Sequence, residues 1–259
     1  MKWPLWLGLI RHDTSLYNVL KGKKKKDPLY LEFLKEFKKN PESETTRALA
    51  RLVSEKHALG VSDAETPLAD KTGRRPFAVG KAMRKKFGKK GLPDIIFVSP
   101  YLRTWQTLAY LIRGWPELDE IKIVEEERIR EQEHGLSLLY NDWRVFHALH
   151  PEQGRLFRLE GAYWYRYPQG ENVPDVRARD RSWTTTLIRE FAGKKILAIT
   201  HHLNILGVRA NFERWGSQKF IHVDETDKPD NCSLTVYEGN PNKGKNGRFE
   251  LKHYNWKLW

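Results

Sequence analysis

The stretch that decides the fold is Leu7–Asn18, which reads Leu-Gly-Leu-Ile-Arg-His-Asp-Thr-Ser-Leu-Tyr-Asn. Its apolar start, preceded by Trp6, stops abruptly at Arg11-His12, and polar residues that favour turns follow. A short apolar run bounded by turn formers predicts a buried strand that feeds a loop. In an open α/β sheet, ligands bind at the loops that leave the carboxyl ends of the strands. The sequence therefore places Arg11 and His12 where chemistry is expected.

The residue types at Arg11 and His12 suit phosphate chemistry. The planar guanidinium of arginine offers a phosphate two parallel charge-assisted hydrogen bonds. An imidazole is a nucleophile or a proton carrier near neutral pH. Such a dipeptide is also common on protein surfaces, so its interpretation depends on other segments of the chain.

The composition fits a single domain over residues 1–259. The chain has 259 residues, is 39% hydrophobic and carries a formal net charge of +13. That charge suits small phosphorylated substrates, although a solvated basic surface explains most of the lysines. No aromatic-interleaved basic motif is present, which disfavours nucleic acid as a partner. The single cysteine, Cys232, excludes an internal disulfide, and we expect it to be buried in a strand.

The first residues of the chain do not read as a signal peptide. Their apolar part is short, lacks a small-residue cleavage site and runs straight into the Arg-His loop. No apolar stretch is long enough to cross a bilayer. We therefore expect a cytoplasmic protein without a membrane partner, and the sequence leaves homo-oligomer formation open.

Strands that alternate with helices predict the α/β class, here a three-layer α/β/α sandwich around a mostly parallel central sheet. Besides the first strand, we expect strands at residues 94–98, 121–124, 195–200, 233–237 and 249–254. We expect helices at residues 73–87, 102–112, 137–150, 173–192 and 203–215.

A helical insertion is expected at about residues 20–66, after the first strand. Apolar spacing predicts helices over residues 28–39 and 42–57, whereas the four-lysine run 23–26 reads as an exposed loop. Because the insertion follows the carboxyl end of the strand, we expect it to overhang the active-site edge of the sheet as a lid or substrate-selecting subdomain.

Three further strand ends carry the residues that phosphate chemistry needs. The second strand is followed by Ser-Pro-Tyr-Leu-Arg-Thr, which puts Arg103 in the first turn of a helix. The amino end of a helix and a guanidinium both favour an anion. The third strand is followed by Arg-Glu-Gln-Glu-His-Gly at residues 130–135, and the fourth ends in Thr-His-His at residues 200–202.

Together these segments resemble the histidine phosphatase superfamily, which contains the cofactor-dependent phosphoglycerate mutases and many broad phosphatases. Arg11-His12 resembles its Arg-His-Gly motif, Ser99–Thr107 its Ser-Pro-x-x-Arg-x-x-x-Thr segment, and residues 200–202 its Ser-His-Gly. Residues 130–135 resemble the segment that carries its proton donor, and Gly170–Asn172 resembles its Gly-Glu-Ser. The resemblance covers most of the chain apart from the insertion.

The resemblance implies a phosphatase that hydrolyses phosphate monoesters through a phosphohistidine on His12, without a metal ion or another cofactor. Arg11, Arg103 and His201 would surround the oxygens of the phosphoryl group, which carry its charge during transfer. Asn18 could donate a hydrogen bond to one of these oxygens.

The proton donor implied by the resemblance is Glu131, which would protonate the leaving alcohol and then take a proton from water. Glu133 and Glu127 lie in the same acidic stretch and remain alternatives. His202 starts the helix after the fourth strand and could bind phosphate or substrate. His134 and Glu171 are further candidates for the pocket.

Asp13 and His202 stand where the family has glycine. A carboxylate beside a phosphate pocket would repel the substrate, so either Asp13 points away and caps the next turn or catalysis is weakened. A phosphoglycerate mutase is the first alternative, but mutases continue Arg-His-Tyr-Gly-Gly after the donor, whereas this chain continues Gln-Glu-His-Gly-Leu. A phospho-ligand-binding protein with weak or no catalysis is the second alternative.

Overall fold

The computed structural model describes residues 3–259 and confirms the α/β class with a mostly parallel sheet. Its six-stranded sheet has the order β3-β2-β4-β1-β5-β6. The first four strands in that order run parallel to one another. β5 pairs antiparallel with β1, and β6 pairs antiparallel with β5. The strand bounds are β1 (Trp6–Arg11), β2 (Ile95–Val98), β3 (Ile123–Glu125), β4 (Lys195–Thr200), β5 (Leu234–Asn240) and β6 (Arg248–Trp256).

The register of the central strands brings the predicted motifs to one edge of the sheet. Arg11, the last residue of β1, is paired with Thr200, the last residue of β4. On the other side of β4, Val98 of β2 is paired with Ile199. Because the carboxyl ends of parallel strands share one edge, the residues that follow these strands meet there.

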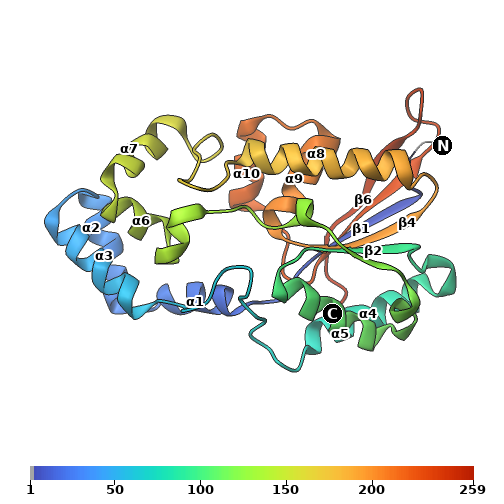
Figure 1. Ribbon diagram of the computed structural model, residues 1–259, viewed down its shortest axis with the longest axis horizontal. Coiled ribbons are helices and arrows are strands. Elements are labelled where there is room, and N and C mark those ends of the chain that lie inside the picture. Colours follow the sequence, from blue (N-terminus) through green and yellow to red (C-terminus); the bar gives the residue numbers. More distant parts are fainter. Residues whose placement is uncertain (1–2) are drawn as a thin grey trace.

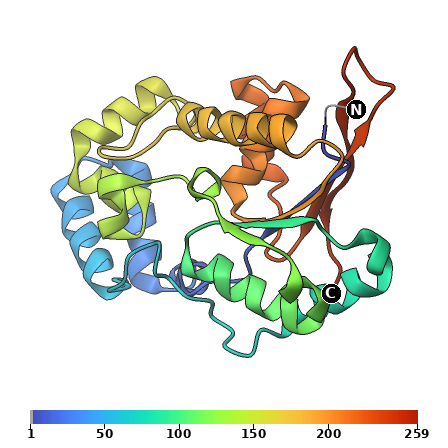
Figure 2. The ribbon, with the colours of Figure 1, turned by 45° about the vertical axis from the view of Figure 1, so that its right-hand side comes forward.

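Helices cover both faces of the sheet, as Figures 1 and 2 show. One face carries α4 (Arg74–Phe87) and α5 (Leu102–Gly114), and the other carries α8 (Val173–Glu190) and α9 (His202–Glu213). Side chains alternate along β1 with the period of a strand. Leu7 and Leu9 pack with α8 and α9, whereas Ile10 packs with α4 and α5.

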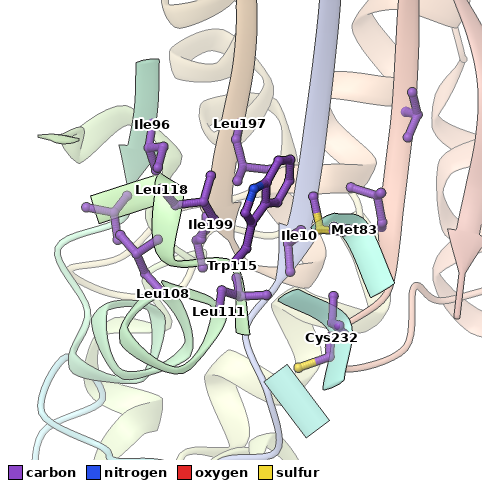
Figure 3. Packing of buried hydrophobic residues seen from close by; sticks show 14 residues of the cluster. Ile10, Met83, Ile96, Leu108, Leu111, Trp115, Leu118, Leu197, Ile199 and Cys232 are labelled. Carbon is purple, nitrogen blue, oxygen red and sulfur yellow. The ribbon is translucent and has the colours of Figure 1, made fainter. Parts of the chain in front are cut away.

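The core between the sheet and α5 is drawn in Figure 3. Ile199 and Leu197 of β4 pack with Trp115, Leu108 and Leu111, and all of these side chains are at most 2% exposed. Burying side chains of this size stabilises the fold by about 1.5–3 kcal/mol each relative to exposure. The core thus fixes β4 and α5, the elements that precede and carry His201 and Arg103.

Glycines let α4 and α5 cross closely. A Cβ atom on Gly80 would lie 2.3 Å from the carbonyl oxygen of Leu111, and one on Gly114 would lie 2.2 Å from that of Phe77. These distances are far below van der Waals contact, so any larger residue at either position would push the helices apart.

Over the segment where a helical insertion was expected, the structure has α2 (Pro28–Lys39) and α3 (Glu44–Lys56), close to the two predicted helices, and α1 (Leu16–Lys24), which was not predicted. Two helices from a later segment, α6 (Trp143–Leu149) and α7 (Pro151–Glu160), lie against it (Figure 1). The two segments share a core of Tyr30, Phe33, Ala50, Val53, Val145 and Ala148. We call these five helices the helical cap.

The four-lysine run is only partly the exposed loop that was predicted, because Lys25 and Lys26 are exposed in a turn whereas Lys23 and Lys24 are helical. Lys23 and Lys24 are the last residues of α1, which begins at a capping box formed by Ser15 and Asn18. The side chain of Lys24 is only 3% exposed, and its Nζ donates to the carbonyl oxygen of Asn141 and to Asp142. The run was misjudged because the partner of Lys24 lies far away in the sequence.

The helix predicted over residues 137–150 is interrupted. A 3₁₀ helix, η4 (Gly135–Tyr140), ends at Asn141, whose φ of 51° cannot continue a helix, and Asp142 then caps α6. Neither α7 nor α10 (Ser217–Thr226) was predicted, nor were the short 3₁₀ helices η1 (Lys89–Gly91), η2 (Pro116–Glu120) and η3 (Glu127–Ile129). None of the helices in the described part of the chain is long and apolar enough to cross a membrane.

Cys232 is buried as expected, but it precedes the strand. It lies in a turn with a φ of 62°, and β5 begins two residues later at Leu234. The backbone N–H of Cys232 donates to the carbonyl oxygen of Arg11 at 3.0 Å, so this turn closes against the end of β1.

Candidate active site

His12 lies directly after β1, and both its backbone N–H and its carbonyl oxygen are hydrogen-bonded. Its backbone N–H donates to the carbonyl oxygen of Thr200 at 2.9 Å, and its carbonyl oxygen accepts from Asn231. In the side chain, Nδ1 donates to the carbonyl oxygen of Asp13 at 2.6 Å. A carbonyl oxygen only accepts, so Nδ1 carries the proton, and the neutral ring has its lone pair on Nε2. This is the tautomer that a nucleophilic Nε2 requires.

Burial lowers the pKa of His12 well below its usual value, and the charges of Arg103 and Arg11 lower it further. His12 is 3% exposed. The imidazole is therefore neutral at physiological pH, so its Nε2 lone pair is available throughout the neutral range.

His201 follows β4 and faces His12. The ring centroids are 5.1 Å apart, and both side chains are buried. Its Nε2 is hydrogen-bonded to Ser99 Oγ at 2.7 Å, and Nδ1 is buried without a partner among residues 3–259. Burial, followed by the charge of Arg103, lowers the pKa of His201. An anion placed between the two rings would stabilise the protonated form of His201.

Arg11 and Arg103 complete a cationic cup around His12. Arg11 Nη1 donates to the carbonyl oxygen of Pro229 at 2.7 Å, and Arg103 extends from the first turn of α5. In both residues Nε is buried and has no partner in the described part of the chain. Burial lowers the pKa of Arg11, an effect that the carboxylate of Glu131 opposes.

Glu131 lies beside the start of α9. Its Oε1 accepts from the backbone N–H groups of Gln132 at 3.1 Å and Leu203 at 3.2 Å. Of the alternative donors, Glu133 accepts a hydrogen bond from the Tyr101 hydroxyl at 2.6 Å, and Glu127 is exposed in η3. The charge of Glu131 acts on Arg11, and its role as the proton donor stays a prediction.

Asn18 and His202 have structural partners. Asn18 Oδ1 accepts from Ser15 in the capping box of α1. His202 Nε2 lies 2.5 Å from Asp224 Oδ1 of α10. Burial disfavours ionisation of Asp224, but His202 and Lys228 outweigh it and lower the pKa of Asp224 to about 2. Phosphate binding by Asn18 and His202 therefore stays a prediction.

The other pocket candidates differ in their surroundings. His134 contacts the ring of Tyr167 edge-on at 4.9 Å, and burial lowers its pKa. Glu171 pairs with Arg179 at 2.9 Å and with Arg130 at 3.0 Å, so its carboxylate is neutralised. Glu171 therefore orders the segment before Glu131.

The Asp13 carboxylate caps the next turn, as one of the two interpretations of the sequence expected. Its Oδ1 accepts from the backbone N–H of Thr14 at 2.7 Å and from Arg75 Nη1 at 2.9 Å. The backbone N–H of Asp13 donates to Thr107 Oγ1 at 3.0 Å. The carboxylate that replaces the family glycine is thus neutralised by a cation from α4.

Sequence reasoning missed Asp63, Arg75 and Asp224, which hold Arg103, Asp13 and His202. Each partner lies in another element, so no local pattern marks it. Arg103 Nη1, for example, donates to the Asp63 carboxylate at 3.0 Å across 40 residues of chain.

No group of His, Cys, Asp or Glu between residues 3 and 259 is arranged to hold a metal ion. Two surface hollows, of about 980 and 610 Å³, lie away from His12: one lies between α2, α6 and α7, and the other beside the β5–β6 turn. The site is therefore located by its convergent charged groups and not by the size of a hollow.

The comparisons with known proteins concern the family and the fold. The histidine phosphatase superfamily (branch 1) matches residues 66–256, a stretch that includes Arg103, Glu131 and His201 but begins after Arg11-His12. The structure resembles that of mycobacterial glucosyl-3-phosphoglycerate phosphatase in complex with inorganic phosphate, with a TM-score of 0.62 and 16% identity over 98% of each chain. That likeness shows the shared fold, β1 included.

Two curated relatives from Arabidopsis thaliana match part of the chain. Phosphoglycerate mutase-like protein AT74 is 28% identical over 162 residues, which is 60% of this chain and 48% of that protein. Phosphoglycerate mutase-like protein AT74H is 35% identical over 149 residues, which is 55% of this chain and 50% of that protein. The matched stretches span about half the length of these relatives. On the family match over residues 66–256, the chain belongs to the histidine phosphatase superfamily.

Proposed function

We propose that this protein is a phosphatase that hydrolyses phosphate monoesters through a phosphohistidine on His12. The observation that carries the proposal is a set of buried nitrogens without protein partners: the donors Arg11 Nε and Arg103 Nε, and His201 Nδ1, which donates when Ser99 Oγ donates to Nε2 and the ring proton is on Nδ1. Unpaired buried donors are costly in a folded protein and require an explanation. A phosphoryl group beside His12 would satisfy all of them.

In the first step, the lone pair of His12 Nε2 attacks phosphorus and forms an N–P bond. The bond between phosphorus and the leaving oxygen breaks, and Glu131 donates a proton to that oxygen. The guanidinium groups of Arg11 and Arg103 stabilise the charge spread over the remaining oxygens.

In the second step, water attacks the same phosphorus atom from the side that the alcohol has left. Glu131, now ionised, accepts a proton from this water, and the N–P bond breaks to release phosphate. Regeneration of neutral His12 is favoured by the same burial and neighbouring cations that lower its pKa. The enzyme thereby returns to its starting protonation state.

Rapid-quench labelling tests the covalent step. Wild-type enzyme mixed with p-nitrophenyl phosphate and quenched within milliseconds should carry a phosphate that is labile in acid and stable in base. The His12→Ala variant should carry none and should lose on the order of a thousandfold or more in turnover. His222→Ala, an exposed position on α10, is the matched control and should behave like the wild type.

Mutase activity, which the names of the curated relatives suggest for those proteins, is separated by a second assay. The enzyme is incubated with 3-phosphoglycerate and 2,3-bisphosphoglycerate, and isomerisation is compared with phosphate release. Phosphate release should be the faster process. Isomerisation that outpaces it would replace the phosphatase with a mutase, and the absence of label on a wild type that still binds phosphate would favour a binding protein.

A further inference from the structure

The segment between α3 and α4, residues 57–73, reaches the cationic cup through one side chain. Its backbone is tied to the first turn of α5, where the N–H of Leu102 donates to the carbonyl oxygen of Ala64 at 2.8 Å. This contact places Asp63 against the guanidinium of Arg103. The two side chains are 19% and 5% exposed, so little solvent screens their interaction.

Asp63 occupies one end of the Arg103 guanidinium. Nη1 donates to the backbone oxygen of Asp63 at 2.5 Å and to Oδ1 at 3.0 Å, while Nη2 donates to Oδ2 at 3.3 Å. A guanidinium has five N–H hydrogens, and these contacts use both on Nη1 and one on Nη2. The remaining pair, on Nε and Nη2, lies along a single edge and suits two phosphoryl oxygens.

A carboxylate on a phosphate-binding arginine could instead block the substrate, but the contacts argue against blocking. The edge that Asp63 leaves free is the one with the buried, unpartnered Nε. The guanidinium also lies over the ring of Tyr101, with 4.7 Å from its carbon to the centroid, which fixes its plane. Because Tyr101 fixes the plane of the guanidinium and Asp63 fixes its Nη end, the free Nε edge can face in only one direction.

We propose that Asp63 is a positioning residue that holds the Nη end of Arg103 so that its Nε edge faces the phosphoryl group. The inference rests on the proposed function. In it, residues 57–73 orient Arg103, the side chain that the proposed function assigns to phosphate binding. Preorganised donors bind a transferring group more tightly because no reorganisation is needed at the moment of reaction.

The test compares Asp63→Ala and Asp63→Asn with a matched control, Glu65→Ala. Glu65 lies in the same loop and is exposed, and its carboxylate accepts only from Ser62 among the described side chains. The measurements are kcat and KM for p-nitrophenyl phosphate, inhibition constants for inorganic phosphate and orthovanadate, and the thermal midpoint.

Asp63→Ala should raise KM and both inhibition constants about tenfold, a coupling typical of residues in direct contact. Asp63→Asn should recover part of the loss, because its amide oxygen still accepts from Arg103 Nη1. Glu65→Ala should match the wild type in every measurement. Asp63→Ala leaves Arg103 buried without its carboxylate partner, so its thermal midpoint should fall, and the constants are therefore measured at a temperature where every variant is folded. In a double-mutant cycle, Asp63→Ala should have little further effect once Arg103→Ala is present.

Tighter phosphate binding by Asp63→Ala would overturn the inference, because it would mean that the carboxylate competes with phosphate. Unchanged constants, or equal losses in the presence and absence of Arg103, would overturn it as well. If one of these outcomes is found and the wild type hydrolyses p-nitrophenyl phosphate, the role of Asp63 is overturned but the proposed function stands. A wild type that neither hydrolyses the ester nor responds to phosphate or vanadate would remove both.

Discussion

The carboxyl edge of the sheet and the Lys24–Asp142 ion pair of the helical cap differ in how their buried charged groups are paired. At the edge, Arg11 Nε and Arg103 Nε are buried with no protein partner in the described chain. In the cap, the buried Lys24 has two acceptors, and Asp142 also accepts from the hydroxyl of Tyr30 at 2.6 Å. Edge donors left unpaired are held ready for a ligand, whereas paired cap groups hold helices together.

This difference separates turnover from stability. In the proposed mechanism, a substitution at the edge removes a group that interacts with the reacting phosphoryl, so it should lower turnover more than stability. A substitution at a paired cap residue leaves a buried partner behind, so it should lower stability more than turnover. The predictions below test that separation, beginning with the largest expected effect.

Among these substitutions, we expect Glu131→Gln to lower turnover the most. Glutamine keeps an oxygen that accepts from the N–H of Leu203, so the fold and phosphate inhibition should be retained. Turnover of an alkyl phosphate should fall by about 10²–10⁴, the usual contribution of general acid–base catalysis. Turnover of p-nitrophenyl phosphate should fall less, because its leaving group departs without a proton.

Glu133→Gln is the matched control, since this carboxylate is hydrogen-bonded to Tyr101. The comparison of kcat for glycerol phosphate and p-nitrophenyl phosphate reports which residue is the donor. If Glu133→Gln shows the dependence on leaving group and Glu131→Gln does not, the roles are reversed.

In the cap, Lys24→Met should cost about 3 kcal/mol of unfolding free energy, because it leaves Asp142 charged and buried without its main partner. Urea unfolding followed by fluorescence measures this cost. Lys25→Met, an exposed neighbour, should stay within about 0.5 kcal/mol of the wild type. Turnover per folded molecule should change less than twofold, and a large loss of turnover without a loss of stability would break the contrast between edge and cap.

The contrast between the sheet edge and the cap also explains which parts of the structure could be predicted from the sequence. The strand Lys195–Thr200 was predicted with its correct bounds, because four consecutive apolar residues read locally as a buried strand. The end of this strand placed His201 and His202 at the edge of the sheet, and the resemblance to the family singled out His201. Arg103 was predicted for the same reason, as the first turn of a helix after a strand.

Contacts in the cap join residues that are far apart in the sequence, so no local sequence pattern predicts them. Lys24 meets Asp142 across 118 residues, so its burial could not be inferred from the lysine run around it. The α7 helix begins at Pro151 immediately after α6, where the sequence offers a single helix boundary and no clear second period. Asp63 lies in a loop without periodicity, and its role depends on the path that the loop takes over α5.

The smallest effect concerns His147, a buried cap residue whose Nε2 has no partner among residues 3–259. Burial, with the charge of Arg158, lowers its pKa to about 4. The unfolded chain therefore takes up a proton near pH 6.5, whereas the folded protein takes it up only near pH 4. Between these values acid favours unfolding, and at pH 5 this histidine should cost about 2 kcal/mol.

His147→Phe removes this titration and keeps an aromatic ring beside Phe157, whose centroid is 4.9 Å away. Its unfolding free energy should equal or slightly exceed that of the wild type at pH 7.5 and should fall less steeply toward pH 5. His12, His134 and His201 contribute to the remaining slope, because their lowered pKa values act in the same direction. If the unfolding free energies of the two proteins fall in parallel from pH 7.5 to pH 5, the folded cap accommodates a protonated His147. The unpaired Nε2 of His147 would then resemble the unpaired nitrogens at the edge, which await a partner.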